Sequence, residues 1–251
     1  LASLAPFYSR DYELMFAEAW NFTFMPKAPN ADKLLGERIE IKQSNDFLLL
    51  QKYHGIKFNT HKYNSLPEFL CIVNSELLSG HPLILSLPRY CCPWSPLYHK
   101  QLDKIRHSLI IIGIDKENEY LICTDPFYTK YKVQLPINDL EFDYLSLTTF
   151  DLLDINNTID WHEIAENIVS QVRSKNNYFN NSFDAIRYFG NEISQITHLN
   201  REINDNSDSS LEKKIYGIDY SRRKVSLLFE YIGNQYNIDE FVLLSNKMMQ
   251  V

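Results

Sequence analysis

Apolar side chains follow a helical period near the start of the chain. Residues 11–20 place them at i, i+3, i+4 and i+7, which predicts an amphipathic helix. Residues 66–79 predict another helix, with Pro67 in its first turn and Gly80 at its end. Shorter segments complete this part: helices are expected at residues 1–8, 31–35 and 46–54, and a strand at residues 56–61.

The pattern then changes to short apolar runs, as the strands of a buried sheet require. Residues 108–114 are apolar, residues 115–118 are polar, and residues 119–124 are largely apolar again, which predicts a β-hairpin. Residues 89–106 combine aromatic residues with prolines and predict a long ordered loop. Further strands are expected at residues 81–87, 130–135 and 144–150.

Helical periodicity returns after residue 151. Ile164, Ile168 and Val172, for example, recur at four-residue spacing. The predicted helices cover residues 160–176, 181–196, 211–234 and 238–249, with a polar loop at 204–210. We therefore predict an α+β domain with an antiparallel sheet at residues 1–150 and an all-helical domain at residues 151–251.

Composition narrows the classes of function. The 251 residues carry a net charge of -7 without a basic block, which argues against nucleic acid as a partner. No glycine-rich phosphate-binding motif occurs, and we expect no cofactor. No apolar run reaches the ~20 residues of a membrane span, and no signal peptide is present, so we expect no membrane partner. The 4 cysteines lack C-x-x-C spacing, which predicts reduced thiols in a cytoplasmic protein.

The predicted hairpin brings an imidazole and a carboxylate together. With the turn centred on Lys116, Leu109 faces Cys123 and His107 faces Asp125. Opposed residues in an antiparallel pair have Cβ atoms about 4.5–5.5 Å apart, and diagonal neighbours stay within reach. A histidine that starts a strand is often structural, and Asp before Pro often begins a turn. Their pairing at the end of a buried hairpin instead favours a general base that is oriented by a carboxylate.

Several short stretches carry a resemblance to a known family. They are residues 1–4, 16–20, 80–84, 90–94, 98–99, 113–115 and 125–126, together with Tyr8 and His107. On these residues the chain resembles the N-terminal family of butirosin biosynthesis protein H, within the papain-like (C39-like) cysteine peptidases. The resemblance implies an acyltransferase of bacterial antibiotic biosynthesis, including nonribosomal peptide assembly. Such an enzyme moves an acyl group from an acyl or peptidyl carrier protein thioester to a small-molecule amine, or to water. The resemblance implies His107 as the general base and Asp125 as its orienter.

The resemblance also places the nucleophilic cysteine at the start of the first helix, a few residues before residues 1–4. A thiol at a helix N-terminus and beside an imidazole is stabilised as the thiolate. That position falls upstream of Leu1. Because the sequence opens inside a helical pattern and without Met, we expect the cysteine to precede the residues given. Ser3 is a weaker alternative.

Residues of the long loop are predicted to line the acyl or acceptor pocket: Tyr90, Cys91, Cys92, Trp94, Tyr98 and His99. Cys91 and Cys92 align with an aromatic–aliphatic pair of the family pattern, which favours lining the pocket over attack on the substrate. Cys71 and Cys123 are expected in the core, because a buried cysteine usually packs as a small hydrophobic residue.

Other interpretations stay open. The same fold could bind a carrier protein or a small natural product without turnover. A self-processing amidohydrolase is disfavoured, because the first residue offers no nucleophilic side chain. Neither His99, Asp103 and His107 nor His54 and His61 have compact zinc-ligand spacing, so we expect no metal site. The sequence does not indicate an oligomeric state.

Overall fold

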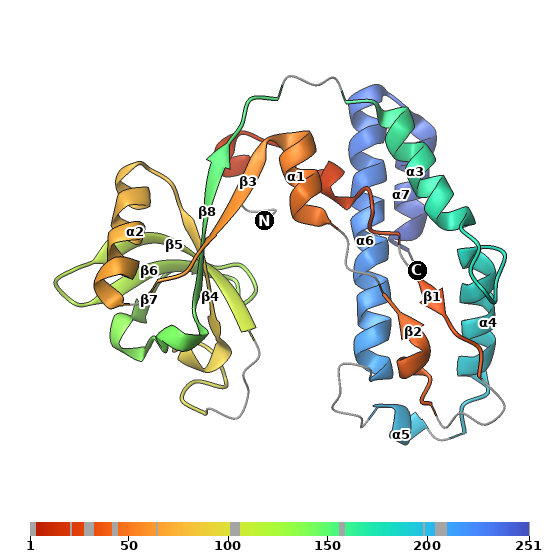
Figure 1. The fold of residues 1–251 in the computed structure, drawn as a ribbon, viewed down its shortest axis with the longest axis horizontal. Coiled ribbons are helices and arrows are strands. Elements are labelled where there is room, and N and C mark those ends of the chain that lie inside the picture. Colours follow the sequence, from red (N-terminus) through yellow and green to blue (C-terminus); the bar gives the residue numbers. More distant parts are fainter. Residues whose placement is uncertain are drawn as a thin grey trace. The chain divides into compact units, whose positions relative to one another are not determined.

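The computed structural model of this chain describes residues 4–20, 22–27, 33–41, 45–63, 65–100, 106–155, 159–197, 199–203 and 210–250. The described chain is a mixed α+β protein, as predicted (Figure 1). It forms two compact units. Leu1–Phe7 and Gly55–Asp154 form the sheet unit, and Tyr8–His54 and Ile155–Val251 form the helical unit. Each unit thus combines two separate stretches of sequence, whereas the pattern suggested one division near residue 150.

The sheet unit is built on a six-stranded antiparallel sheet with the order β3-β8-β4-β5-β6-β7. The predicted strands are all present, with small changes at their ends. They are β3 (Ile56–His61), β4 (Leu83–Pro88), β5 (Arg106–Asp115), β6 (Tyr120–Asp125), β7 (Lys130–Pro136) and β8 (Ser146–Leu152). Short 3-10 helices follow the strands: η4 (Arg89–Cys91), η5 (Ile137–Asp139) and η6 (Phe142–Tyr144).

Helix α2 (Leu66–Leu78) packs against β4 and β5, close to its predicted bounds. Ser65 caps the helix by accepting a hydrogen bond from the Glu68 N–H at 3.4 Å. Gly80 follows the helix with φ of 80°, which side chains with a Cβ rarely adopt. The buried core of the unit contains apolar side chains from α2 and the strands, including Phe69, Val73, Leu85, Leu109, Ile111, Leu121, Cys123, Leu135 and Leu147.

The β5–β6 hairpin has the predicted strands but not the predicted register. Ile111, rather than Leu109, faces Cys123. The residue pair next to the connecting loop is Asp115 with Tyr120, so this loop is wider than a turn centred on residue 116 allows. The residue after Ile111 also forms a β-bulge, which shifts the pairing once more. The direct opposition predicted for His107 and Asp125 is therefore wrong.

The helical unit contains the remaining helices and a small ribbon of strands β1 and β2. The helices predicted in its C-terminal part are present, and α6 continues through Gly217. The elements are η2 (Glu13–Phe16), β1 (Thr23–Phe24), η3 (Gly36–Arg38), β2 (Ile39–Glu40), α1 (Asp46–His54), α3 (Trp161–Arg173), α4 (Ser182–Ser194), α5 (Leu199–Ile203), α6 (Leu211–Tyr236) and α7 (Asp239–Met248). No helix in the described ranges has both the length and the apolar character that crossing a bilayer requires.

The N-terminal part of the helical unit differs most from the prediction. The helix expected at residues 11–20 is wrong, since only η2 forms there. Residues 22–40 contain the β1–β2 ribbon, where no strand was predicted. Phe22, Phe24 and Ile39 pack in one cluster with Ala185 and Phe189 of α4, so contacts far along the sequence determine this segment. The helix expected at residues 1–8 is limited in the described part to the 3-10 turn η1 (Pro6–Tyr8), and residues 33–35 of the helix expected at 31–35 are not helical. Residues 1–3, 31–32 and 204–209 of the predicted segments lie outside the described residues.

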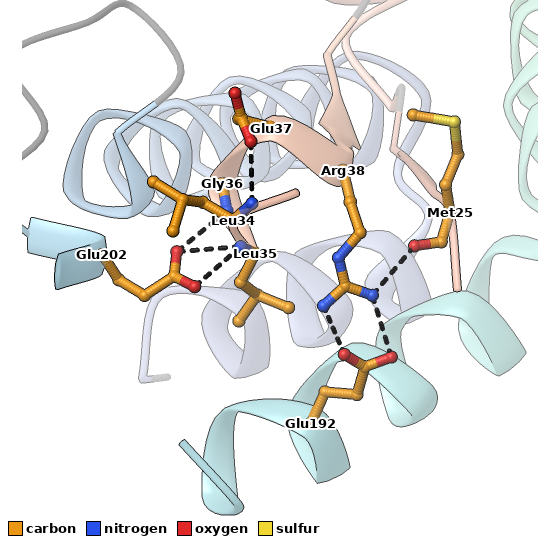
Figure 2. A network of polar contacts seen from close by, with 8 residues as sticks. All are labelled: Met25, Leu34, Leu35, Gly36, Glu37, Arg38, Glu192 and Glu202. Carbon is orange, nitrogen blue, oxygen red and sulfur yellow. Dashed lines mark hydrogen bonds and ion pairs between the residues drawn. The ribbon is translucent and has the colours of Figure 1, made fainter. Parts of the chain in front are cut away.

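A buried ion pair ties this segment to α4, as Figure 2 shows. The Arg38 guanidinium pairs with the Glu192 carboxylate through both of its Nη atoms. Arg38 Nη1 also donates to the Met25 carbonyl at 3.2 Å. On α5, the Glu202 carboxylate accepts a hydrogen bond from the Leu35 N–H at 2.8 Å. Carboxylates of two helices therefore bind the Arg38 guanidinium and the Leu35 N–H of this segment.

Candidate functional site

His107 and Asp125 lie in contact in the sheet unit, although they do not face each other directly. His107 Nε2 and Asp125 Oδ2 are 2.7 Å apart, and both side chains are buried. Ile111 faces Cys123, and continuing this register places Asp125 opposite Leu109. His107 then lies two residues along the same face of β5, because successive side chains of a strand alternate between faces. Such diagonal neighbours are within reach of a long side chain.

The Asp125 carboxylate accepts hydrogen bonds on both oxygens. Oδ2 accepts from Trp94 Nε1 at 2.7 Å in addition to His107. Oδ1 accepts from the backbone N–H groups of Phe127 at 3.1 Å and Tyr128 at 3.2 Å. These last bonds form the Asx turn that an Asp-Pro sequence favours. Together the four donors fix the carboxylate in one orientation, so the imidazole that it contacts is also oriented.

This contact determines which nitrogen of His107 could act as a base. An ionised carboxylate can only accept hydrogen bonds, so the network assigns the proton of the neutral imidazole to Nε2. The lone pair then lies on Nδ1. Within the described residues, no hydrogen bond to Nδ1 is formed. The His107 ring is therefore held at one nitrogen and available at the other.

Two aromatic rings flank the imidazole. The ring centroids of Phe127 and Tyr128 lie 5.6 and 5.4 Å from that of His107, each in an edge-on arrangement. The Phe127 side chain is 65% exposed, although it contacts this buried ring. The guanidinium of Arg89, the first residue of η4, lies over the Phe127 ring at 5.5 Å. The site therefore has an apolar wall that reaches the solvent and a cation beyond it.

The first three residues predicted to line a pocket lie in the core of the sheet unit. Tyr90, Cys91 and Cys92 are buried among its apolar side chains. The Tyr90 hydroxyl donates to Glu141 at 2.6 Å, and this hydrogen bond raises the pKa of Tyr90. The structure therefore places these three side chains in the core of the sheet unit.

Trp94, Tyr98 and His99 lie further along the same loop. Trp94 is the one of the three that bonds to Asp125. The Tyr98 hydroxyl instead donates to Asp139 at 2.6 Å, which raises the pKa of Tyr98. His99 is exposed, has φ of 56° and contacts the Tyr98 ring. Residues 101–105 of the loop, including Asp103, lie outside the described residues.

The cysteines near this site are poorly suited to attack. Burial raises the pKa of the Cys91 thiol to about 11 and, together with the charge of Asp125, that of Cys92 to about 12. Burial also raises the pKa of Cys123, which lies in the core as predicted. The expectation for Cys71 is wrong, because this residue is exposed on α2. The predicted position of the nucleophile precedes Leu1, and Ser3 lies outside the described residues.

Other possible sites offer less chemistry. Across the described ranges, no group of three or more His, Cys, Asp or Glu side chains is placed to hold a metal ion. The helical unit has a cavity of about 590 Å3, a size that suits a small ligand. Aromatic, amide and charged side chains line it, including Trp20, Tyr53, Glu18, Lys52 and Gln171. No imidazole or thiol of the described residues lies in this lining, so it does not offer the cysteine–histidine pair that the resemblance implies.

Sequence reasoning missed the second layer of the His107 site. Arg89, Phe127 and Tyr128 were not singled out, although the two aromatic residues directly follow the Asp-Pro turn. That adjacency was the available signal, because an Asx turn brings the next backbone N–H groups and side chains back to the carboxylate.

No model of a known protein family matches the chain, and no curated protein is found to be similar to it. Family membership therefore stays a prediction.

Proposed function

We propose that the sheet unit carries the base and orienter of a papain-like cysteine acyltransferase. The main support is the His107–Asp125 contact. The Asp125 carboxylate, which has hydrogen-bond partners on both oxygens, holds Nε2 of His107 and leaves Nδ1 for proton transfer. In this proposal the nucleophilic cysteine is supplied by residues that precede Leu1. The described cysteines near His107 support that choice, because burial raises their pKa values.

The proposed reaction proceeds in two steps. First, Nδ1 of His107 takes the proton of the cysteine thiol, and the thiolate attacks the carbonyl carbon of an acyl thioester. The carbon–sulfur bond of the donor breaks, and the leaving thiolate takes the proton back from His107. Second, an amine attacks the acyl-enzyme, His107 accepts an amine proton, and the enzyme's cysteine leaves as thiolate. Water in place of the amine gives hydrolysis.

The proposed donor is the thioester of an acyl or peptidyl carrier protein, and the proposed acceptor is a small-molecule amine. We propose bacterial natural-product assembly in the cytoplasm as the setting. The exposed thiol of Cys71 suits a reducing compartment, where it would not form a disulfide.

The test uses the protein with the cysteine that this proposal places before Leu1. The protein is mixed with an acyl thioester of N-acetylcysteamine and an amine, and thiol release and amide formation are measured. His107→Gln keeps a donor for Asp125 but has no base at Nδ1, so we expect turnover to fall at least about 1,000-fold. Intact mass should reveal an acylated cysteine in the parent protein. Unchanged turnover in His107→Gln would overturn the proposal.

A second candidate is a binding protein that does not react with its ligand. The observation in its favour is that Cys91, Cys92 and Cys123 are all buried. Isothermal titration of the same protein with an acylated carrier protein separates the two candidates. Binding without thiol release, and without an acylated cysteine, supports the binding protein and excludes the acyltransferase.

A further inference from the structure

Arg89 is a cation that contacts the exposed Phe127 ring beside the imidazole. β4 ends at Pro88, and the preceding Leu87 faces His107 across the β4–β5 ladder. Arg89 therefore leaves the sheet next to the strand position of His107. Its guanidinium carbon lies 5.5 Å from the centre of the Phe127 ring, whose centre lies 5.6 Å from that of the imidazole. The cation and the base thus both contact the same phenyl ring.

The charge of Arg89 has no acidic partner among the described residues. Other arginines form ion pairs, for example Arg38 with Glu192 and Arg223 with Asp219. Arg89 forms none with a described carboxylate, and its Nε is buried without a hydrogen-bond partner. Asp125 is the carboxylate of the same site, but four other donors already occupy its oxygens. The Arg89 guanidinium, without a described carboxylate as its partner, can therefore bind an oxyanion by donating hydrogen bonds to it.

Guanidinium groups bind carboxylate and phosphate groups through paired N–H donors. The partly exposed Phe127 ring between Arg89 and His107 offers an apolar surface for the carbon chain of a ligand. A substrate with an oxyanion at one end could therefore contact Arg89 while its reacting carbon or nitrogen lies beside Nδ1. The spacing selects a short chain, because both groups contact one ring.

We propose that Arg89 is an oxyanion-binding residue that gives the His107 site specificity for a substrate with a carboxylate or phosphate group. This inference rests on the proposed acyltransferase function where it concerns turnover. Its binding component is independent of turnover. The alternative is that Arg89 only packs on Phe127, a role that its aliphatic stem could fulfil without the charge.

Three variants separate these roles. Arg89→Met keeps the stem on Phe127 and removes the charge, whereas Arg89→Lys keeps the charge and loses the paired donors. Arg106→Met is the matched control, because Arg106 adjoins His107 on β5 and strand neighbours point to opposite faces. Equal melting temperatures of the variants and the parent establish that each one folds.

The binding test follows the imidazole resonances of His107 by NMR in the full chain, at constant ionic strength, as sodium phosphate or sodium succinate replaces sodium chloride. We expect saturable shifts in the parent and in Arg106→Met. Arg89→Lys should bind roughly 3–10-fold more weakly, and Arg89→Met at least about 10-fold more weakly. Saturation by one anion alone identifies the group recognised. No saturation in the parent below about 50 mM, or equal binding by Arg89→Met, overturns the proposal.

The turnover test compares butyryl and succinyl thioesters, which differ in a terminal carboxylate. Arg89→Met should lower kcat/KM for the succinyl thioester at least about 10-fold and change the butyryl value less than about 3-fold. Equal losses for both substrates would contradict anion recognition. If the parent turns over neither thioester, the proposed function fails, and the NMR titration still decides the role of Arg89.

Discussion

Polar side chains surround the buried Arg38 in the helical unit and the buried Asp125 in the sheet unit, and the two clusters differ in the chemistry that their contacts allow. In the helical unit, Arg38 pairs with Glu192, and the buried Arg38 Nε has no hydrogen-bond partner among the described residues (Figure 2). In the sheet unit, Asp125 holds Nε2 of His107, and no described residue bonds to Nδ1. The Arg38 guanidinium is bound by Glu192 and by the Met25 carbonyl, so we assign the first cluster a structural role. A neutral imidazole can accept a proton, so the second cluster can also do chemistry.

The most severe test of this difference is Asp125→Asn. The amide places an NH2 group against donors on one of its two sides, so it cannot satisfy both the His107–Trp94 pair and the two backbone N–H groups. We expect thioester turnover to fall about 1,000–10,000-fold, as when a histidine loses its orienting carboxylate. Steady-state kinetics, corrected for the folded fraction, measures this change.

The matched control is Asp139→Asn. The Asp139 carboxylate accepts a hydrogen bond from Tyr98 in the same region but does not contact His107. Its variant should change turnover less than about 3-fold. If Asp125→Asn stayed within that range, Asp125 would be structural, and the contrast between the two clusters would disappear.

The corresponding test in the helical unit is Glu192→Ala. The Arg38 side chain is only 6% exposed, so removal of its partner leaves a buried uncompensated charge. We expect a loss of about 3–5 kcal/mol in the free energy of unfolding, while turnover per folded molecule stays unchanged. Guanidinium denaturation followed by circular dichroism measures the stability.

Two further variants calibrate this loss. Arg38→Met combined with Glu192→Leu removes both charges, and should restore most of the stability. Arg223→Gln breaks the pair with Asp219, in which both side chains are at least half exposed, and should cost less than about 1 kcal/mol. A loss below about 1 kcal/mol for Glu192→Ala would show that the buried pair does not hold the segment.

The difference between the units also explains how far the sequence could predict them. The strands of the sheet unit could be predicted because each one is marked by a short run of apolar residues in its own sequence. The His107–Asp125 contact was predicted although its register was wrong, since a shift of two residues keeps side chains on the same face. The bulge after Ile111 had one local signal, because Gly113 lies inside the predicted strand and a glycine within a strand often marks a bulge. The wider loop could not be predicted, because residues 115–118 are polar and fit a short turn as well as a longer one.

The N-terminal part of the helical unit shows the opposite case. Leu14, Met15 and Phe16 are consecutive and all buried. The helical period of apolar residues at 11–20 therefore did not correspond to one buried helix face. The ribbon around Phe24 is held by α4, which lies more than 100 residues away in sequence. Local periodicity contains no information on such contacts, which is why a helix was expected at residues 11–20.

Two buried histidines extend the comparison to pH. His54 Nε2 accepts a hydrogen bond from the Leu14 N–H at 3.1 Å, so the His54 ring is neutral. In His107 the corresponding nitrogen, Nε2, instead donates to Asp125. Burial lowers the pKa of His54 from 6.5 to about 4, opposed by Asp11 and assisted by Arg10. The unfolded chain therefore takes up a proton more readily. We expect the stability of the helical unit to be complete above pH 6.5 and to fall by about 3 kcal/mol towards pH 4.

Urea denaturation at a series of pH values measures this loss. The control is His54→Gln, whose side-chain oxygen can still accept from the Leu14 N–H but does not titrate. Its stability should vary less between pH 6.5 and 4 than that of the parent. Identical profiles for the two proteins would assign the pH dependence to other groups.

The smallest predicted effect decides whether Trp94 lines a pocket or holds the carboxylate. Trp94→Phe keeps most of the ring but removes the 2.7 Å bond to Asp125 Oδ2, the oxygen that also contacts His107. Because three donors remain on Asp125, we expect kcat to fall only about 10-fold, with KM within about 2-fold. Trp161→Phe in the helical unit, where the ring stacks on His162, should change neither constant. A raised KM with unchanged kcat would instead make Trp94 part of the substrate pocket, because lost uniform binding affects KM alone.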